Sequence, residues 1–432
     1  MILKPLALSQ DNEKNQIYLG HSNSLLALFP GKVQFRSNSS STSKPGSDTR
    51  KMIIEHSFDF FWLRENGQPV KAPYAKIIDY FQYPEMRFSG FLRGCSDAPD
   101  ALRREKQDEY GQRILVFGFA NDRVFGAVVT EKDSQIVPEL LRAELFAPKS
   151  VFRKLNLGIE SAASINPKQL IQELESIGSV KQYESQILRK DIGAPEPFRG
   201  LQGAGWTMEA LLGIPRNSSA SPDKYGFEIK TYSGSQLTLM TPEPDSGHRY
   251  EHGLTSFLEK YGWAGTKSDG SLRFNGRHKV DRIYPKSGLS LHIENWNKET
   301  NSPTGNGSPN VLLINSANDE IAAGWSFEKL AERWAKKHAG AFYIPSHKYH
   351  QDQIKFPSHY SFGPEVLCGI GTNVVLFLKA LNEGIVFLDP GDRVDFNGEE
   401  KKRTQWRISK QRGLTFSSTL AQLYDDVSTF KI

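Results

Sequence analysis

The sequence predicts a chain of two parts, a mostly β part of about 160 residues followed by an α/β part. Its 432 residues exceed one ordinary domain, and the first part alone is long enough for a separate hydrophobic core. That part is rich in short runs of branched and aromatic residues broken by turn formers, which is the pattern of strands. In the second part, runs with the apolar spacing of a helix stand next to strand-like runs.

Strand-like runs dominate the first part. They are KVQFRS, KMIIEHSFDFFWL, EMRFSGFL, QRILVFGFA and RVFGAVVT. One helical stretch is expected near residues 137–146. These elements predict a β-barrel or sandwich-like domain. Residues 37–48 read as a low-complexity loop, and residues 300–310 in the second part have the same character.

Charge, cysteines and hydropathy exclude several classes of protein. The net charge of +5 is too small for a global field, so binding of nucleic acid must rest on local clusters. Cys95 and Cys368 lie far apart and support neither a disulfide framework nor a zinc cluster. No run is long and apolar enough to span a bilayer, and the first residues lack a signal-peptide pattern. We therefore expect a cytoplasmic protein with no membrane partner.

The segment from residue 203 to residue 241 carries the clearest chemical pattern. Asp223, Glu228 and Lys230 are spaced Asp-x4-Glu-x-Lys, and residues 225–232 favour a strand. Strand side chains alternate between faces, so Glu228 and Lys230 project to one side, while Asp223 enters from a Pro-Asp turn. Two carboxylates there can hold Mg²⁺ beside a phosphate, and the lysine can orient or deprotonate a water. A charged strand at a solvated sheet edge has the same triplet, so the flanking residues must decide.

The flanking residues favour a metal-dependent phosphodiesterase site. Glu209 lies in TMEALLG, whose apolar residues have helical spacing and whose Gly213 is a helix stop. A helix that ends there brings Glu209 toward the same metal. After the strand, Ser233 and Gly234 form a turn and residues 237–241 predict a second strand. We therefore expect a hairpin beside the site.

These features together resemble the MvaI and BcnI restriction endonucleases and, more distantly, the mismatch-repair nickase MutH. The residues that carry the resemblance are a Gly-rich segment, the helix with Glu209 and LLG, Asn217, Pro222-Asp223, Gly226, Glu228-Ile229-Lys230-Thr231 and the TLMT strand. Upstream, QLIQELESI is similar to the family's opening helix. Downstream, GWSFEKLAERWAKK, GAFYIP, NVVLFLKALNEG, IVFLD and KKRTQWRIS follow its order of elements. The family-like region is thus 161–432, preceded by an added domain at 1–160.

The resemblance implies a PD-(D/E)xK nuclease fold for residues 161–432, with a mixed sheet flanked by helices. It implies Asp223, Glu228 and Lys230 as the catalytic triplet and Glu209 as an additional acidic group. Mg²⁺ would be held by Asp223, Glu228 and the backbone carbonyl of Ile229. The implied enzyme is a type II restriction endonuclease that hydrolyses double-stranded DNA at a short GC-rich site, leaving 5′-phosphate and 3′-hydroxyl. It would act as a monomer, with a cognate methyltransferase as genetic partner.

Local basic and aromatic residues predict where DNA lies. The sharpest cluster is the acid-free run KKRTQWRISKQR, in which Arg403 and Arg407 can read guanine edges. Lys401 and Lys402 suit phosphate contacts. A solvated basic face is the alternative for such a run, although Trp406 within it favours DNA. Other expected contacts are His248, Arg249, Tyr250 and Arg277 in the second part, and Arg87 and Arg93 in the first, where ordinary surface arginines are the alternative.

Two histidine pairs have spacings that zinc ligands also use. They are His248 with His252 and His347 with His350. Zinc sites need further ligands and groups that orient them, which the sequence does not show. Prolines before His248 predict a loop there. We therefore expect no zinc and take His248 as a DNA contact.

The role of the N-terminal domain stays open on sequence alone. It can bind a second, effector copy of the DNA target, or it can sense modified bases, as in a modification-dependent endonuclease. A MutH-like enzyme that nicks one strand with the help of a partner is another open class. A DNA-binding module without activity is disfavoured because the chain keeps the whole triplet.

Overall fold

We describe the protein from a computed structural model. The described residues are 1–6, 16–20, 29–37, 52–80, 85–120, 122–145, 150–154, 167–200, 202–216, 222–265, 270–304, 307–338, 340–349, 358–410 and 415–432. The chain forms two compact units, Met1–Ser161 with Thr304–Ser308 and Ala162–Pro303 with Pro309–Ile432. Asn217, His350 and the end of the basic run at Arg412 lie outside the described residues, as do residues 38–48.

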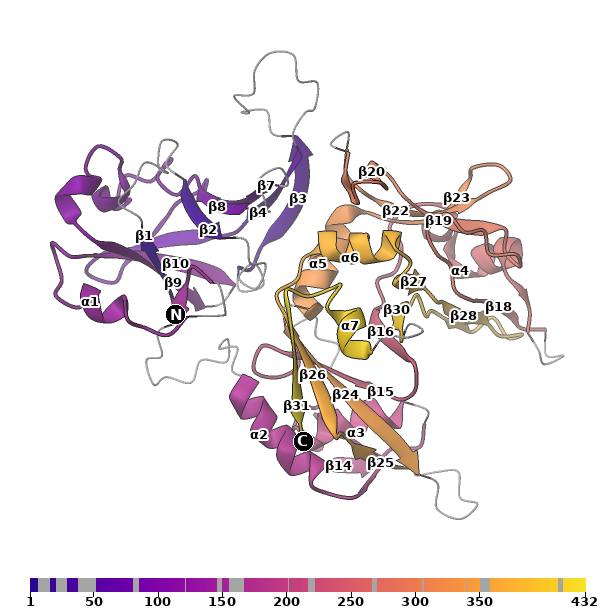
Figure 1. Cartoon of the computed structure of the whole chain (residues 1–432). Helices are drawn as coiled ribbons and strands as arrows, with labels where there is room; N and C mark the ends of the chain where they lie inside the picture. Colours follow the sequence, from indigo (N-terminus) through magenta and orange to yellow (C-terminus); the bar gives the residue numbers. More distant parts are fainter. Residues whose placement is uncertain are drawn as a thin grey trace. The chain divides into compact units, whose positions relative to one another are not determined.

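The first unit, indigo to purple in Figure 1, is built from two sheets. Their strand orders are β11-β1-β9-β10-β5-β6 and β2-β8-β7-β4-β3, and β10 and β5 run parallel. The strands are β1 (Ile2–Leu6), β2 (Ile17–Gly20), β3 (Lys32–Ser37), β4 (Met52–Ser57), β5 (Phe60–Leu63), β6 (Pro69–Lys71), β7 (Lys76–Tyr80), β8 (Glu85–Ser89), β9 (Arg113–Ala120), β10 (Arg123–Thr130) and β11 (Arg153–Lys154). Helix α1 is Val137–Leu140, shorter than expected.

The two sheets of the first unit share one core. Phe60 and Phe117 come from one sheet and Ile77 and Phe88 from the other, and all four belong to the same buried cluster. The ring centroids of Phe60 and Phe88 are 5.1 Å apart in an edge-to-face arrangement, a favourable geometry for aromatic pairs. The mostly β character is therefore confirmed. Neither sheet closes on itself among the described strands, so they show no barrel.

A mixed sheet organises the second unit, as Figure 1 shows below its centre. Its order is β12 (Tyr183–Glu184), β25 (His359–Phe362), β24 (Gly340–Tyr349), β26 (Glu365–Ile370) and β31 (Asp426–Lys431). Strand β15 (Glu228–Tyr232) also pairs with β24, and this pair is parallel. Helices α2 (Pro167–Gly178) and α3 (Gly203–Leu211) contribute Leu170, Leu174 and Met208 to the core beneath the sheet. Mixed sheet and flanking helices are confirmed.

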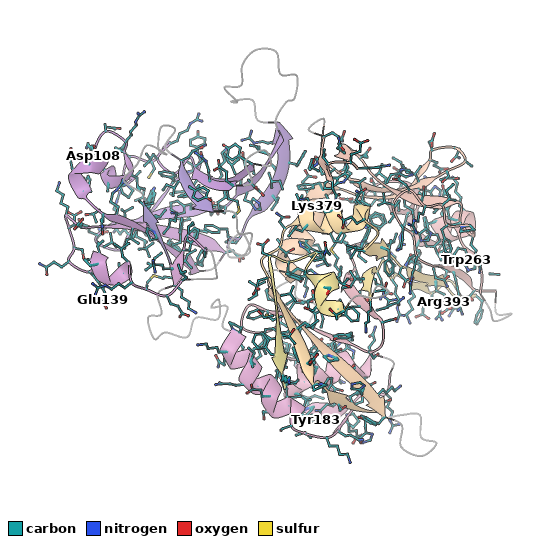
Figure 2. All side chains as sticks on the ribbon, in the orientation of Figure 1. Asp108, Glu139, Tyr183, Trp263, Lys379 and Arg393 are labelled. Carbon is teal, nitrogen blue, oxygen red and sulfur yellow. The ribbon has the colours of Figure 1, made fainter. Side chains whose placement is uncertain are left out.

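Smaller sheets and further helices complete the second unit. The sheets are β16 (Gln236–Met240), β30 (Trp406–Ser409) and β27 (Val386–Leu388); β17 (Trp263–Ala264), β18 (Leu272–Asn275), β28 (Gly391–Val394) and β29 (Glu400–Lys401); β19 (Leu289–Ile293), β22 (Val311–Asn315) and β23 (Ile321–Trp325). Two ribbons are β13 (Gln186–Leu188) with β14 (Pro195–Pro197) and β20 (Trp296–Asn297) with β21 (Ser302–Pro303). The helices are α4 (His248–Tyr261), α5 (Phe327–His338), α6 (Val374–Asn382) and α7 (Phe416–Leu420). Figure 2 shows the side chains, with Trp263 on β17 and Arg393 on β28 labelled.

Two local expectations are wrong. Strands β15 and β16 form at the expected places but not as a hairpin, because β15 pairs with β24 and β16 pairs with β30. The residues from His248 on form helix α4 rather than a loop, since Pro242 and Pro244 stop short of it and Gly247 precedes its first turn. Helices α2, α3, α5 and α6 and strands β24, β27 and β30 fall where the sequence places them, whereas β25, β26 and β31 of the main sheet were not expected. No helix of the described residues is long and apolar enough to cross a membrane.

Candidate active site

A tight turn places Asp223 at the entrance of β15. The backbone N–H of Phe227 donates to the Lys224 carbonyl at 2.8 Å, and the N–H of Asp223 donates to the Phe227 carbonyl at 2.9 Å. Tyr225 and Gly226 both have positive φ, +49° and +79°, as so sharp a reversal requires. The Ile229 N–H donates to Asp223 Oδ2 at 2.8 Å. The carboxylate of Asp223 is therefore fixed against the first residues of the strand.

The turn is also tied to the helical layer. Lys224 Nζ donates to Glu173 Oε2 at 2.6 Å and to the Leu212 carbonyl at 2.7 Å. The Tyr225 hydroxyl donates to the other Glu173 oxygen at 2.7 Å. Glu173 lies on α2 and Leu212 directly follows α3. Two helices thus hold the turn that carries Asp223.

Glu228 is a buried carboxylate clamped by two lysines. It is 6% exposed at the start of β15, whose backbone is fixed by parallel pairing with β24. Its Oε1 accepts from Lys230 Nζ at 3.0 Å, as the alternation of strand side chains predicts. Its Oε2 accepts from Lys337 Nζ at 3.0 Å. Burial by itself raises the pKa of Glu228, but Lys230 and Lys337 outweigh it and hold that pKa below its ordinary value.

Glu209 joins the same charge cluster from α3. This helix contacts β15, and Gly213, with φ of +70°, follows its end as expected. Burial raises the pKa of Glu209 to about 7, and the neighbouring charges of Asp223 and Glu228 add to the effect. Burial and Glu228 likewise raise the pKa of Asp223 to about 6. The three carboxylates therefore interact electrostatically, and the nearby lysines balance only part of their negative charge.

Asp223, Glu228 and the main chain that follows offer oxygen donors of the kind that Mg²⁺ and Ca²⁺ prefer. Ile229 directly follows Glu228, so its carbonyl is part of the same strand entrance. The unbalanced negative charge at this point is what a divalent cation would neutralise. No three His, Cys, Asp or Glu side chains among the described residues form a complete metal cage. The residues thus fit a cation held by two carboxylates, with remaining positions left to water and substrate.

Lys337 is the site residue that sequence reasoning missed. It lies in the last turn of α5, more than a hundred residues after the triplet, and nothing in its local sequence sets it apart from Lys336. The next residue, His338, explains its position. The buried His338 ring bonds to the Tyr424 hydroxyl at 2.8 Å and to the Leu239 carbonyl at 3.0 Å. These bonds anchor the end of α5 beside Glu228.

A model of the MvaI/BcnI restriction endonuclease family matches residues 168–415, more than half of the chain. The chain belongs to this family. As a member of the MvaI/BcnI family it is a restriction endonuclease, a type II site-specific deoxyribonuclease.

The chain is similar to restriction endonuclease MvaI in complex with its cognate DNA substrate, with 18% identity and a TM-score of 0.45 over 60% of this chain and 96% of that one. It is similar to MvaI in the absence of DNA, with 16% identity and a TM-score of 0.33 over 63% and 99% of the two chains. No curated protein matches.

Among the expected DNA contacts of this family member, Arg249 is embedded in the fold. Its guanidinium, 5% exposed at the side chain, bonds to the buried Asp392 and to Glu243 Oε2, the latter at 2.7 Å. Arg407 also has protein partners, donating to Asp389 Oδ2 at 2.7 Å and to Thr238 Oγ1 at 3.0 Å. Arg249 thus holds α4 to β28, whereas half-buried Arg407 spans the sheet of β16 and β30.

Other expected contacts reach the surface. Tyr250 is 63% exposed, and Lys401 is exposed on β29. Arg277 is exposed and lies over the Phe387 ring, 5.1 Å from its centroid. The three remaining residues already contact other parts of the protein. Arg403 lies against Gly391, Lys402 pairs with Glu400 at 3.3 Å, and His248 bonds to Ser256 Oγ at 3.0 Å.

In the first unit, the two expected arginines differ in their surroundings. Arg87 on β8 pairs with Glu85 at 2.8 Å on the same strand. Arg93 lies over the ring of Tyr74, 4.6 Å from its centroid, and Tyr74 is itself 50% exposed. Arg93 with Tyr74 therefore forms an accessible cationic and aromatic surface, while Arg87 already has a carboxylate partner.

Proposed function

We propose that the chain is a Mg²⁺-dependent endonuclease that cleaves duplex DNA at a short GC-rich site, with Asp223, Glu228 and Lys230 as its catalytic triplet. The observation that carries the proposal is the cluster of Asp223, Glu228 and Glu209 at the end of β15, with two lysines on Glu228. A bound Mg²⁺ would polarise the phosphate and acidify a water. Mutual repulsion of these carboxylates destabilises the fold, and their gathering at one point is typical of a binding site for a cation and a phosphate.

The protein groups have separate roles in this proposal. Asp223 and Glu228, with the Ile229 carbonyl, hold the cation. As an ammonium, Lys230 would orient the attacking water and offset the charge that grows on the phosphate; only in its neutral form would it accept the proton of that water. The water oxygen gives up a proton and bonds to phosphorus while the bond from phosphorus to O3′ breaks, and O3′ takes a proton from solvent, which leaves 5′-phosphate and 3′-hydroxyl. Glu209 adds negative charge and strengthens the hold on the cation.

The second unit also supplies candidate DNA contacts. We propose that Lys401, Lys402 and Arg403 on and after β29, together with His248, Tyr250 and Arg277, face the duplex. The Arg407 guanidinium donates to Asp389 Oδ2 at 2.7 Å. Arg407 can therefore contact a base only after it releases Asp389. We assign Arg249 to the fold instead, because moving it would leave the buried Asp392 carboxylate without an ionic partner and with only the Arg403 backbone N–H as a donor. A monomer that cuts each strand in turn fits the one such centre found among the described residues.

We further propose that the N-terminal unit binds an effector copy of the target or senses a modified base. Its own core and the exposed pair of Arg93 and Tyr74 support a separate reading surface. A cognate methyltransferase would protect host sites in the cytoplasm, where the enzyme would act.

The experiment that tests the proposal is digestion of methylated and unmethylated DNA of known sequence. Cleavage should require Mg²⁺, stop on addition of EDTA and leave ends that DNA ligase rejoins without kinase treatment. Ends that carry 3′-phosphate, or undiminished cutting in EDTA, would refute the proposed chemistry. Nicks confined to one strand would favour a strand-nicking enzyme.

A further inference from the structure

Each of the two carboxylate oxygens of Glu228 accepts a hydrogen bond from a lysine. Its Oε1 accepts from Lys230 and its Oε2 from Lys337, both at 3.0 Å. The side chain is only 8% exposed, so its lone pairs have little access to bulk water. A divalent cation that binds Glu228 must therefore share an oxygen with an ammonium group, whose positive charge opposes that of the cation.

The two lysines differ in how easily they can leave. Lys230 lies two residues from Glu228 on the same strand, and β15 is locked by its pairing with β24. Lys337 reaches Glu228 from another element, α5, through a four-carbon stem, and its side chain is 20% exposed. Lys337 can therefore swing away from Glu228 toward solvent without any movement of the backbone.

The backbone beneath Lys337 is fixed. His338 bonds to Tyr424 and Leu239, and its ring stacks on Trp334 with centroids 4.0 Å apart. Tyr424 in turn bonds to the Tyr343 hydroxyl at 2.6 Å, which ties α5 to β24. A change at Lys337 is thus confined to its side chain, and the released ammonium stays close to the site.

We propose that Lys337 is an exchangeable counter-cation: a divalent cation displaces it from Glu228, and the displaced ammonium then binds a phosphate oxygen of the DNA strand being cut. This rests on the proposed function of the same site. The exchange keeps Glu228 paired at every stage and moves positive charge onto the substrate only when a cation is present. Lys337 is therefore a catalytic residue as well as a competitor of the metal.

Opposite effects on metal affinity and on cleavage distinguish this role from a structural one. Lys337→Met removes the competitor, so Ca²⁺ titrated calorimetrically into the full-length protein without DNA should bind about threefold more tightly than to wild type. In single-turnover cleavage at saturating Mg²⁺ the same variant should be at least about tenfold slower, because it lacks the phosphate contact. If Lys337 had only a structural role, its substitution would lower both the Ca²⁺ affinity and the cleavage rate.

Two further variants complete the test. Lys336→Met is the matched control, because Lys336 is the adjacent lysine of α5 and pairs with Glu332 on the surface; it should leave Ca²⁺ affinity and cleavage unchanged. Lys337→Arg should weaken Ca²⁺ binding, because a guanidinium grips a carboxylate with two hydrogen bonds and is harder to displace. Ca²⁺ binding by Lys337→Arg still tests the exchange if Lys337→Met fails to fold.

The outcomes separate the inference from the proposed function. Equal or weaker Ca²⁺ binding by folded Lys337→Met, or unchanged binding by Lys337→Arg, overturns the exchange. In that case, loss of Ca²⁺ binding in Glu228→Gln would still support the metal site. If Glu228→Gln binds Ca²⁺ and cleaves like wild type, the metal site itself is wrong and the proposed function fails with it.

Discussion

We expect the ionised Glu209 carboxylate to lower the free energy of unfolding. Burial and two neighbouring carboxylates raise its pKa from the ordinary 4.5 to about 7. Between these values the folded protein binds more protons than the unfolded chain, so stability falls as the pH rises through this window, and the whole penalty is present above pH 7. At about 1.4 kcal/mol for each pKa unit, the penalty is at most about 3–4 kcal/mol, and partial solvent screening lowers it to roughly 1–3 kcal/mol.

Glu209→Gln keeps the shape of the side chain and removes its charge. The variant should therefore be more stable than wild type by roughly 1–3 kcal/mol at pH 8 and almost equal to it at pH 4, where the carboxyl is protonated in both states. Urea unfolding followed by tryptophan fluorescence measures this, because every tryptophan except Trp62 lies after residue 161. Glu175→Gln, at an exposed position on α2, is the control and should change stability little at either pH.

Mg²⁺ provides an independent check on the same reasoning. It should stabilise wild type at pH 8 by binding the folded state, and should stabilise Glu209→Gln less, because a charge that attracts the cation is gone. Equal stability of Glu209→Gln and wild type at pH 8 would refute the electrostatic coupling of Glu209 to Asp223 and Glu228. It would also remove the reason for including Glu209 in the site.

Further predictions concern the fold and the N-terminal unit. Arg249→Met should destabilise the protein by roughly 3–5 kcal/mol, because Asp392 loses its buried partner; unchanged urea stability with weaker DNA binding would instead make Arg249 a DNA contact. A fragment of residues 161–432 should fold by circular dichroism, whereas one starting at residue 200 should not, because it lacks α2 with the buried Leu170 and Leu174; equal stability of the two fragments would place the boundary elsewhere. Residues 1–160 alone should shift duplex DNA in a gel at low salt, and Arg93→Ala should weaken that shift; absence of any shift, with modified or unmodified DNA, excludes a reading role.

The sequence was most informative where local rules decide structure. The spacing of Glu228 and Lys230 predicted a shared face of one strand, and the apolar spacing around Glu209 together with Gly213 predicted a helix and its end; both features are present. Strand β24, helix α6 and strands β27 and β30 were also expected, from runs that follow the family's order of elements, whereas β25, β26 and β31 were not.

Features that depend on distant partners were not predictable. The expected hairpin of β15 and β16 fails because each strand finds a partner more than a hundred residues away, β24 and β30. Lys337 was missed for the same reason, since only the packing of α5 brings it to Glu228. Arg249 looked like a surface cation in a loop, but helix α4 turns it toward Asp392, which no local pattern reveals.

The central claim is that Asp223, Glu228 and Lys230 carry the cleavage chemistry, and single-turnover cleavage of a duplex with the target site tests it most directly. Asp223→Ala, Glu228→Ala and Lys230→Ala should each abolish Mg²⁺-dependent cleavage, while each variant still folds by circular dichroism and keeps a DNA affinity close to that of wild type. Near wild-type cleavage by any one of the three would contradict the assignment of the site.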